Sequence, residues 1–227
     1  MRIYTDFKKE ALGEIKRDLV EMGVKIHPKS YQDKVVAGNP DFETLEIQNY
    51  CYTIINPRPE DLTPTQPWAD AEFKERITRP PVNPGTAWEL RKEIWCEFMT
   101  PEGKFAYNYP ERFARYDQIE RIISRIKEDP DSRQLFLAVY DPSDIQHMGG
   151  VSRVPCTIGY QIQIRNNLLH LTYIQRSCDF ATHYNNDVYL AVKMQHYIAE
   201  QTGYKVGRFT HFLMSLHLFR KDGKGVF

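Results

Sequence analysis

One cysteine and one arginine stand at a spacing that could support nucleophilic chemistry. Cys156 opens an apolar run, and Arg176 follows twenty residues later. A tight turn predicted midway, at Asn166 and Asn167, would bring these two positions together on paired strands. A neighbouring guanidinium can favour the nucleophilic thiolate or bind an anionic substrate. Taken alone, however, such a cysteine is more often a core residue, and such an arginine often forms a surface ion pair.

Three further residues each have a structural and a functional interpretation. Asp187 lies at an expected helix start, where a capping carboxylate is the simplest role. His217 lies in an apolar strand pattern, which is typical of a buried, hydrogen-bonded histidine. Arg133 follows a helix-ending Asp-Pro pair and could act as a turn cation. None of these residues supports a functional conclusion by itself.

Composition narrows the class of protein. The 227 residues carry 30 Lys and Arg against 30 Asp and Glu, so the net charge is zero, which argues against a protein that coats nucleic acid. There is no apolar run long enough to span a membrane, and the N-terminus does not resemble a signal peptide. The 4 cysteines are scattered and form no CxxC pair, which predicts no metal site. We therefore expect a cytoplasmic protein with no direct nucleic-acid or membrane partner.

Hydrophobic patterning predicts an α+β fold, because strands and helices mix without regular alternation. Proline-rich loops, 57–68 and 79–87, flank a short helical segment at 70–76. The other expected elements are a helix over 7–22 ended by Gly23, strands within 34–56, a helix over 110–128, a strand over 134–140, a hairpin of strands 157–165 and 168–175, a helix from Asn186 or Asp187 to Thr202 closed by Gly203, and one or two strands over 206–219.

The combined motifs closely resemble the thymidylate synthase superfamily over about residues 90–220. The matching residues are Pro155-Cys156, Gln161, Gln175-Arg176-Ser177-Cys178-Asp179, Ile94-Trp95, Asp131-Ser132-Arg133 and Ser215-Leu216-His217-Leu218-Phe219. The resemblance implies a mixed sheet packed with helices and a homodimer formed through that sheet. It also implies one catalytic domain over 1–227, here with a C-terminal tail shorter than the family's.

Position 187 bears on which base is the substrate. Thymidylate synthases place an Asn eight residues after the Asp of the Arg-Ser-x-Asp motif, whereas this chain has Asp187. An Asn amide complements the N3–H and O4 of uracil. A carboxyl group that carries a proton can donate to N3 of cytosine and accept from its N4 amino group, and burial favours that protonated form. Asp at this position resembles the deoxycytidylate hydroxymethylases of bacteriophages, and it predicts dCMP as the substrate.

The resemblance also implies a mechanism. The Cys156 thiolate adds to C6 of the pyrimidine, and C5 then attacks the one-carbon unit of 5,10-methylenetetrahydrofolate. Water addition gives a hydroxymethyl product in the phage host's cytoplasm, and hydride delivery gives a methyl product. Glu72, or else Glu75, orders the catalytic water. The remaining roles carried over are substrate binding by Arg133 (reaching the partner's active site), Gln161, Arg176, Ser177, Asn186 and His217, and folate binding by Trp95 and Asp179.

Other interpretations remain. Within the same chemistry, the alternative to dCMP hydroxymethylation is dCMP methylation. Thymidylate synthesis is a further alternative that Asp187 disfavours. A non-catalytic scaffold in a nucleotide-synthesis complex is consistent with the short tail, but such a scaffold has no need for Cys156, Arg176, Ser177 and Asp187 together.

Overall fold

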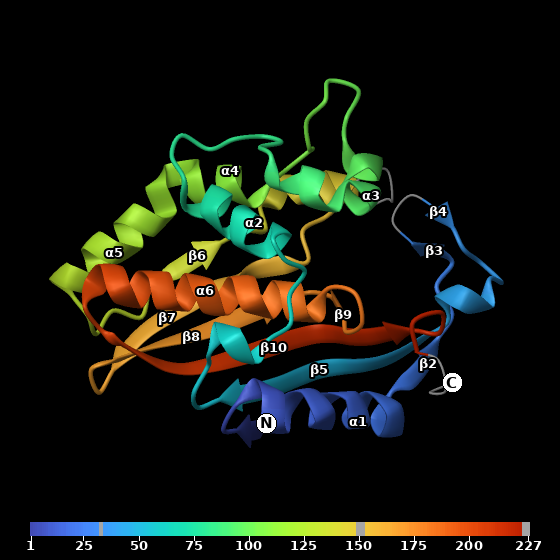
Figure 1. The fold of residues 1–227 in the computed structure, drawn as a ribbon, viewed down its shortest axis with the longest axis horizontal. Helices are drawn as coiled ribbons and strands as arrows, with labels where there is room; N and C mark the ends of the chain where they lie inside the picture. Colours follow the sequence, from blue (N-terminus) through green and yellow to red (C-terminus); the bar gives the residue numbers. More distant parts are fainter. Residues whose placement is uncertain (32–33, 149–152, 224–227) are drawn as a thin grey trace.

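The computed structural model describes residues 1–31, 34–148 and 153–223 and contains one large mixed sheet with helices (Figure 1). The helices are α1 (Leu12–Met22), α2 (Trp68–Ile77), α3 (Lys92–Trp95), α4 (Tyr109–Ala114), α5 (Gln118–Glu128) and α6 (Tyr184–Thr202). The strands are β1 (Arg2–Tyr4), β2 (Val24–Ile26), β3 (Ser30–Tyr31), β4 (Lys34–Val35), β5 (Thr44–Ile54), β6 (Phe136–Ala138), β7 (Thr157–Arg165), β8 (Leu168–Gln175), β9 (Cys178–Asp179) and β10 (Lys205–Phe219).

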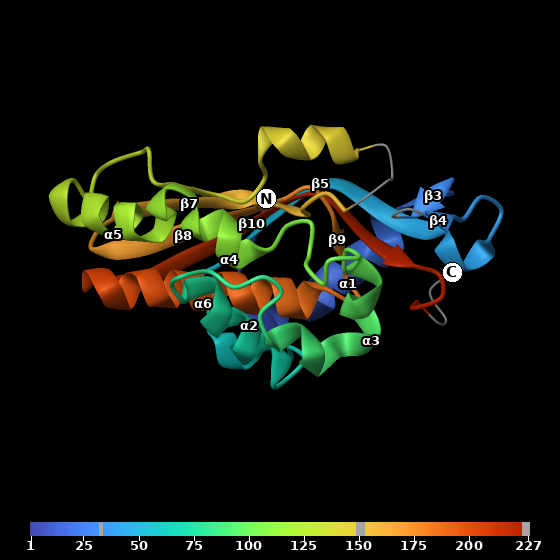
Figure 2. The ribbon, with the colours of Figure 1, turned by 90° about the horizontal axis from the view of Figure 1, so that it is seen from above.

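The sheet runs in the order β1-β5-β10-β8-β7-β6, with β2 paired to β5 and β9 paired to β10. Its pairs are mixed, because β10 runs parallel to β8 and antiparallel to β5. Figure 2 shows α6 and α2 on one side of this sheet and the short 3-10 segment Pro142–His147, in yellow, on the other. The predicted α+β class is confirmed.

The hairpin that carries the candidate chemistry forms as predicted. Strands β7 and β8 pair in antiparallel register from Arg165 and Leu168 at the turn to Thr157 and Gln175 at the far end. Asn166 and Asn167 both have positive φ angles, 52° and 61°, which Asn tolerates better than most residues and which a type I′ turn requires. The hairpin therefore brings the two ends of the 157–175 segment side by side.

Helix α6 ends as predicted but begins earlier. Gly203 closes it with φ 77°, a left-handed conformation in which glycine has no steric penalty. The helix starts at Tyr184, so Asp187 lies inside the first turn rather than at the cap. Its carboxylate is therefore not needed to satisfy the helix end, which leaves it available for other contacts.

Two expected elements differ in detail. The helix predicted over 110–128 is divided into α4 and α5, because Tyr116 and Asp117 adopt positive φ angles of 62° and 51° between them. The hydrophobic periodicity continues across this break, so spacing alone does not reveal it. The strand predicted over 134–140 is confined to Phe136–Ala138, where it pairs with β7 at the edge of the sheet.

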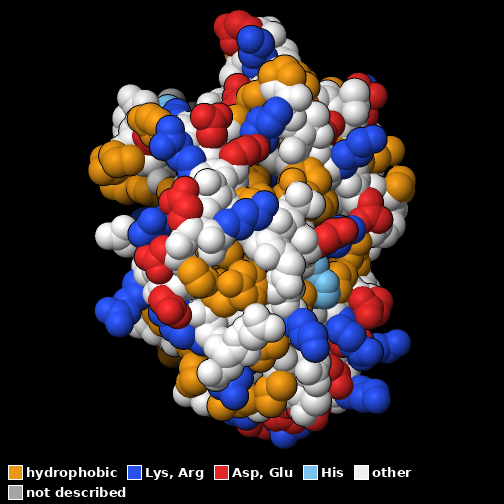
Figure 3. All heavy atoms as spheres, turned by 90° about the vertical axis from the view of Figure 1, so that its left-hand side faces the viewer, with side chains coloured by type: hydrophobic (Ala, Val, Ile, Leu, Met, Phe, Trp, Pro, Cys, Tyr) orange, Lys and Arg blue, Asp and Glu red, His pale blue; other side chains and the backbone are white. Residues whose placement is uncertain are grey.

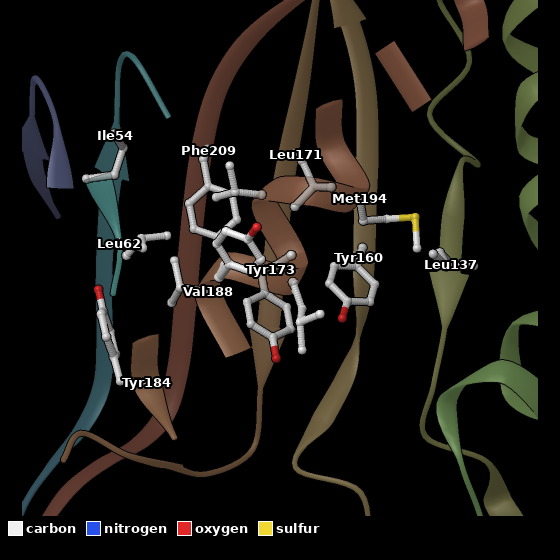
Figure 4. Packing of buried hydrophobic residues seen from close by; sticks show 14 of the residues in the cluster. Ile54, Leu62, Leu137, Tyr160, Leu171, Tyr173, Tyr184, Val188, Met194 and Phe209 are labelled. Carbon is white, nitrogen blue, oxygen red and sulfur yellow. The ribbon is translucent and has the colours of Figure 1, made fainter. Parts of the chain in front are cut away.

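The core lies between the sheet and the helices and is rich in aromatic side chains (Figure 4). Tyr160 and Tyr173 stack with their centroids 4.9 Å apart, and Tyr173 stacks in turn on His211 at 4.7 Å. Along β7, buried Tyr160 and Ile162 alternate with half-buried Gln161 and Gln163. The sheet therefore has one fully covered face, toward α6, and one partly open face.

The surface agrees with the neutral composition. On the side of the molecule in Figure 3, acidic and basic side chains are interspersed rather than gathered by sign. Within the described residues, no helix has both the length and the apolar character needed to cross a membrane.

Candidate functional site

The candidate active site lies where the β7–β8 hairpin ends beside the start of α6. The backbone N–H of Arg176 donates to the carbonyl of Cys156 at 2.7 Å, so the two residues are neighbours across the strands. The Arg176 guanidinium turns back over the same segment, with Nη2 at 3.2 Å from the Val154 carbonyl and 3.9 Å from Cys156 Sγ. The sequence prediction that these two residues lie together is confirmed.

Two cations act on the Cys156 thiol. Burial raises its pKa, the Asp187 charge raises it further, and the charges of Arg176 and Arg153 lower it. The net shift is upward, so the free protein holds a protonated sulfur. The positive charges of Arg176 and Arg153 favour the thiolate, which is the nucleophilic form of the cysteine. Arg176 is exposed, so its guanidinium can also bind an anion.

Asp187 is a half-buried carboxyl group in the first turn of α6, and its charge acts on Cys156. Burial raises its pKa above the usual 3.8, while His183, Arg76, Arg91 and a hydrogen bond from Gln175 oppose the shift. The Gln175 amide donates to Oδ2 of Asp187 at 2.9 Å. The carboxyl group is thus more easily protonated than an exposed aspartate, as donation to a cytosine N3 requires.

The raised pKa makes a prediction about stability. Because the folded pKa of Asp187 lies above its unfolded value, ionising it costs more in the folded protein, and wild type loses stability relative to Asp187→Asn as pH rises through the folded pKa. Below the unfolded pKa both proteins carry a neutral side chain there. Urea unfolding at pH 4 and pH 8 should show Asp187→Asn gaining on wild type at pH 8. A gap that is constant or shrinks over this range contradicts the shift.

Among the residues predicted to bind the nucleotide, Ser177 follows Arg176 directly and is half-buried at the site. Asn186 is buried, and its Oδ1 accepts from the Thr65 N–H at 2.7 Å, so it anchors the proline-rich loop to α6. Gln161 lies on the partly open face of the sheet, where its amide donates to the carbonyl of exposed Arg133 at 3.2 Å. The predicted contact of Gln161 with the nucleotide stays a prediction.

The sugar and folate candidates lie on neighbouring strands. Asp179 and His217 are paired residues of β9 and β10. Asp179 Oδ1 accepts from the backbone N–H groups of Ala181 and Thr182, at 3.0 and 3.3 Å, and so shapes the turn into α6. Burial lowers the pKa of His217, and the Asp179 charge opposes that effect. Phe219 packs edge-on against His217, with ring centroids 5.2 Å apart.

Of the two glutamates considered for ordering water, Glu72 is the better placed. Its Oε1 accepts from Arg76 Nε at 2.8 Å, and the charge of Arg76 reaches Asp187. Glu75 instead accepts from the backbone N–H groups of Thr86 and Ala87, at 2.7 and 2.8 Å, and is occupied in fixing that loop. This arrangement favours Glu72, whose catalytic role remains a prediction.

Trp95 lies in an aromatic cluster next to the site. It stacks on Trp68 with centroids 6.2 Å apart and meets Phe98 and Phe105 edge-on. Arg153 lies over the Trp95 ring at 4.9 Å. The indole N–H groups of Trp68, Trp88 and Trp95 are buried and have no hydrogen-bond partner within the described residues. The cluster therefore combines flat aromatic faces with unused donors.

Sequence reasoning missed several residues that act on the site. Arg76 and Arg91 come from segments outside the motifs, and their positive charge is the one signal that the sequence offers for a role. Arg153 stands three residues before Cys156, a proximity that could have drawn notice. Gln175 belongs to the Gln-Arg-Ser motif but had no assigned role. No cluster of three or more His, Cys, Asp or Glu side chains suited to a metal ion occurs in the described part of the chain.

Comparison with known proteins agrees with this arrangement. The family described as thymidylate synthase matches residues 86–226. A protein of Methanosarcina mazei named putative thymidylate synthase is 34% identical over 146 residues, covering 60% of this chain and 65% of the relative. The thymidylate synthase of Clostridium beijerinckii is 25% identical over 136 residues, covering 59% of this chain and 50% of the relative. The chain thus spans less than two thirds of the length of these relatives.

The fold has a solved counterpart as well. The thermostable thymidylate synthase A of Bacillus subtilis superposes with a TM-score of 0.74 at 20% identity, covering 95% of this chain and 80% of that one. Together, the family match, the mixed sheet and the Cys–Arg–Ser–Asp constellation establish that the chain belongs to the thymidylate synthase family. These three relatives carry the thymidylate synthase name and come from cellular organisms, so they lend no support to a phage hydroxymethylase.

Proposed function

We propose that the chain transfers a one-carbon unit to C5 of a pyrimidine nucleotide through a covalent Cys156 adduct. The observation that carries the proposal is Cys156 beside Arg176, with the charge of Asp187 acting on the same sulfur. The thiolate would form a bond to C6, and the C5=C6 electron pair would make C5 nucleophilic toward the one-carbon unit. Loss of the C5 proton and breakage of the bond between that carbon and its carrier nitrogen would leave an exocyclic methylene. Water or hydride would then add to the methylene carbon as the sulfur–C6 bond breaks. A scaffold without catalysis has no use for this arrangement.

We propose cytosine as the base, because a protonated Asp187 presents one donor and one acceptor to N3 and N4. The upward shift of the Asp187 pKa, which burial causes, supports this assignment. Thymidylate synthesis from dUMP is the second candidate, and the names of the relatives favour it. Those names also favour a methyl over a hydroxymethyl product, so dCMP methylation gains weight against dCMP hydroxymethylation.

The aromatic cluster fits 5,10-methylenetetrahydrofolate, which members of this family use. A pterin is flat and polar, and the Trp68–Trp95 stack with its unused indole donors offers surfaces and hydrogen bonds of that kind. When bound, this group supplies the one-carbon unit and, for a methyl product, the hydride. Trp95 would stack on the pterin, and Asp179 would contact the folate. Arg153 lies over the Trp95 ring, next to this place.

The phosphate and the quaternary structure complete the proposal. Arg176 and Ser177 would bind the 5′-phosphate, and His217 the sugar. The partly open sheet face, which includes Gln161, would pair with a second copy, and the exposed Arg133 would reach the partner's nucleotide. Strand faces that alternate buried and half-buried residues are suited to such a contact.

The test uses dCMP and dUMP tritiated at C5, each with methylenetetrahydrofolate. Release of tritium from dCMP at least about tenfold faster than from dUMP supports the cytosine assignment, and the reverse preference supports thymidylate synthesis. The product mass then distinguishes addition of a methyl from a hydroxymethyl group. If neither nucleotide loses tritium, the chain is not a C5 transferase and the scaffold interpretation stands.

A further inference from the structure

Asp187 is one end of a chain of hydrogen bonds that runs through the core. Gln175 Nε2 donates to Asp187 Oδ2 at 2.9 Å, and Gln175 Oε1 lies 2.8 Å from His211 Nε2. His211 Nδ1 lies 3.0 Å from the Tyr52 hydroxyl, which in turn bonds the Tyr184 hydroxyl. Tyr184 and Asp187 both belong to the first turn of α6, so the chain leaves that helix, crosses β8, β10 and β5, and returns to it.

The four side chains behind Asp187 are sealed from solvent. Gln175, His211, Tyr52 and Tyr184 are each 0% exposed, so these polar groups depend on one another. Burial lowers the pKa of His211 to about 3, which makes the imidazole neutral with one N–H. A neutral imidazole donates from one nitrogen and accepts at the other, so its tautomer sets the direction of the whole chain.

Only two directions satisfy every group. In the first, Nε2–H of His211 donates to Gln175 Oε1, the Gln175 amide donates to Asp187 Oδ2, and the Tyr52 hydroxyl donates to Nδ1. In the second, the Gln175 amide is reversed, a proton on Asp187 Oδ2 donates to Gln175 Oε1, and Nδ1–H donates to Tyr52. The observed placement of the Gln175 amide is the first direction, and it keeps Oδ2 an acceptor.

We propose that Gln175, His211 and Tyr52 are positioning residues that fix Oδ1 as the only oxygen of Asp187 able to carry a proton, and so set the pyrimidine preference of the site. With Oδ1 as donor and Oδ2 as acceptor, the carboxyl group matches the N3 and N4 groups of cytosine in one orientation. A uracil edge requires the donor on the other oxygen, which the Gln175 amide disfavours. This inference rests on the proposed function.

The test breaks the chain at two points away from the nucleotide. His211→Phe keeps a ring stacked on Tyr173 but removes both nitrogens, and Tyr52→Phe removes one hydroxyl. We expect the ratio of kcat/KM for dCMP to that for dUMP to move toward unity by about tenfold in His211→Phe and by severalfold in Tyr52→Phe. Tyr50→Phe is the matched control, because Tyr50 lies on the same strand but bonds Asp18 at 2.6 Å, outside the chain. Its ratio should stay within about twofold of wild type.

A second readout needs no turnover. Nitrogen-15 NMR of the imidazole should find His211 protonated at Nε2 in wild type, and calorimetric dissociation constants for dCMP and dUMP should converge in both chain variants. A ratio that survives both substitutions, or an Nδ1–H tautomer in wild type, overturns the inference. A wild-type preference for dUMP refutes cytosine as the substrate, whereas a wild-type preference for dCMP that survives both substitutions overturns the positioning role alone, so the two failures are distinguishable.

Discussion

Replacing Cys156 with serine should lower kcat for C5 tritium release by about a thousandfold or more, as an order-of-magnitude expectation for a lost nucleophile. A serine hydroxyl is far harder to ionise than a thiol, and the charges of Arg176 and Arg153 are too weak to compensate for that difference. The expected KM for the nucleotide changes little, because Arg176 and Ser177 remain in place. Tritium release and nucleotide binding, measured on the same preparation, check both statements.

The matched control is Cys51→Ser. Cys51 is a half-buried free thiol of β5, and strands β10 and β8 separate it from β7, which follows Cys156. Its activity should remain within about twofold of wild type. Substantial turnover in Cys156→Ser, or an equal loss in Cys51→Ser, contradicts covalent catalysis by Cys156.

Replacing Asp187 with asparagine should shift the ratio of kcat/KM from dCMP toward dUMP by about a hundredfold. An asparagine NH₂ group has two hydrogens, so it can donate both to O4 of uracil and to a reversed Gln175 amide, while its oxygen accepts from N3–H. A protonated carboxyl oxygen has one hydrogen and cannot make both bonds. Competition between dCMP and dUMP in one reaction, with products separated by mass, measures the ratio directly.

Asn185→Asp serves as the control for that substitution. This substitution changes an amide to a carboxyl group on the same helical turn, the inverse of Asp187→Asn. In wild type, Asn185 Oδ1 accepts from the Thr63 N–H at 3.3 Å, and an aspartate oxygen can accept the same hydrogen bond. The base preference should therefore stay within about twofold of wild type. If Asp187→Asn retains the wild-type ratio, residue 187 does not bind the base edge as proposed.

Local sequence rules account for most of the hairpin that carries the nucleophile. The Asn166-Asn167 turn sets the register of β7 and β8 as far as Gly159, and an irregularity between Gly159 and Thr157 shifts that register by one residue, which places Cys156 beside Arg176. Gly203 likewise fixes the end of α6. These features depend on backbone preferences of single residues, which a sequence displays directly.

The surroundings of Asp187 could not be predicted in the same way. Gln175, His211 and Tyr52 come from β8, β10 and β5, and their contact depends on strand order. The sequence predicts that β10 exists, but nothing in its pattern says that it pairs with both β8 and β5. Burial and hydrogen bonding set by tertiary packing therefore decide the protonation of the site, whereas the motifs decide only which groups are present.

The central claim is that Cys156 attacks C6 of a cytosine nucleotide whose C5 then accepts the one-carbon unit. With 5-fluoro-dCMP and methylenetetrahydrofolate, the fluorine at C5 cannot leave as the proton does, so the reaction should stall with nucleotide and folate joined to the protein. Peptide mass spectrometry should find both on Cys156, formed at least about tenfold faster with 5-fluoro-dCMP than with 5-fluoro-dUMP. Attachment to another residue, no adduct with either nucleotide, or faster trapping by 5-fluoro-dUMP would contradict the claim.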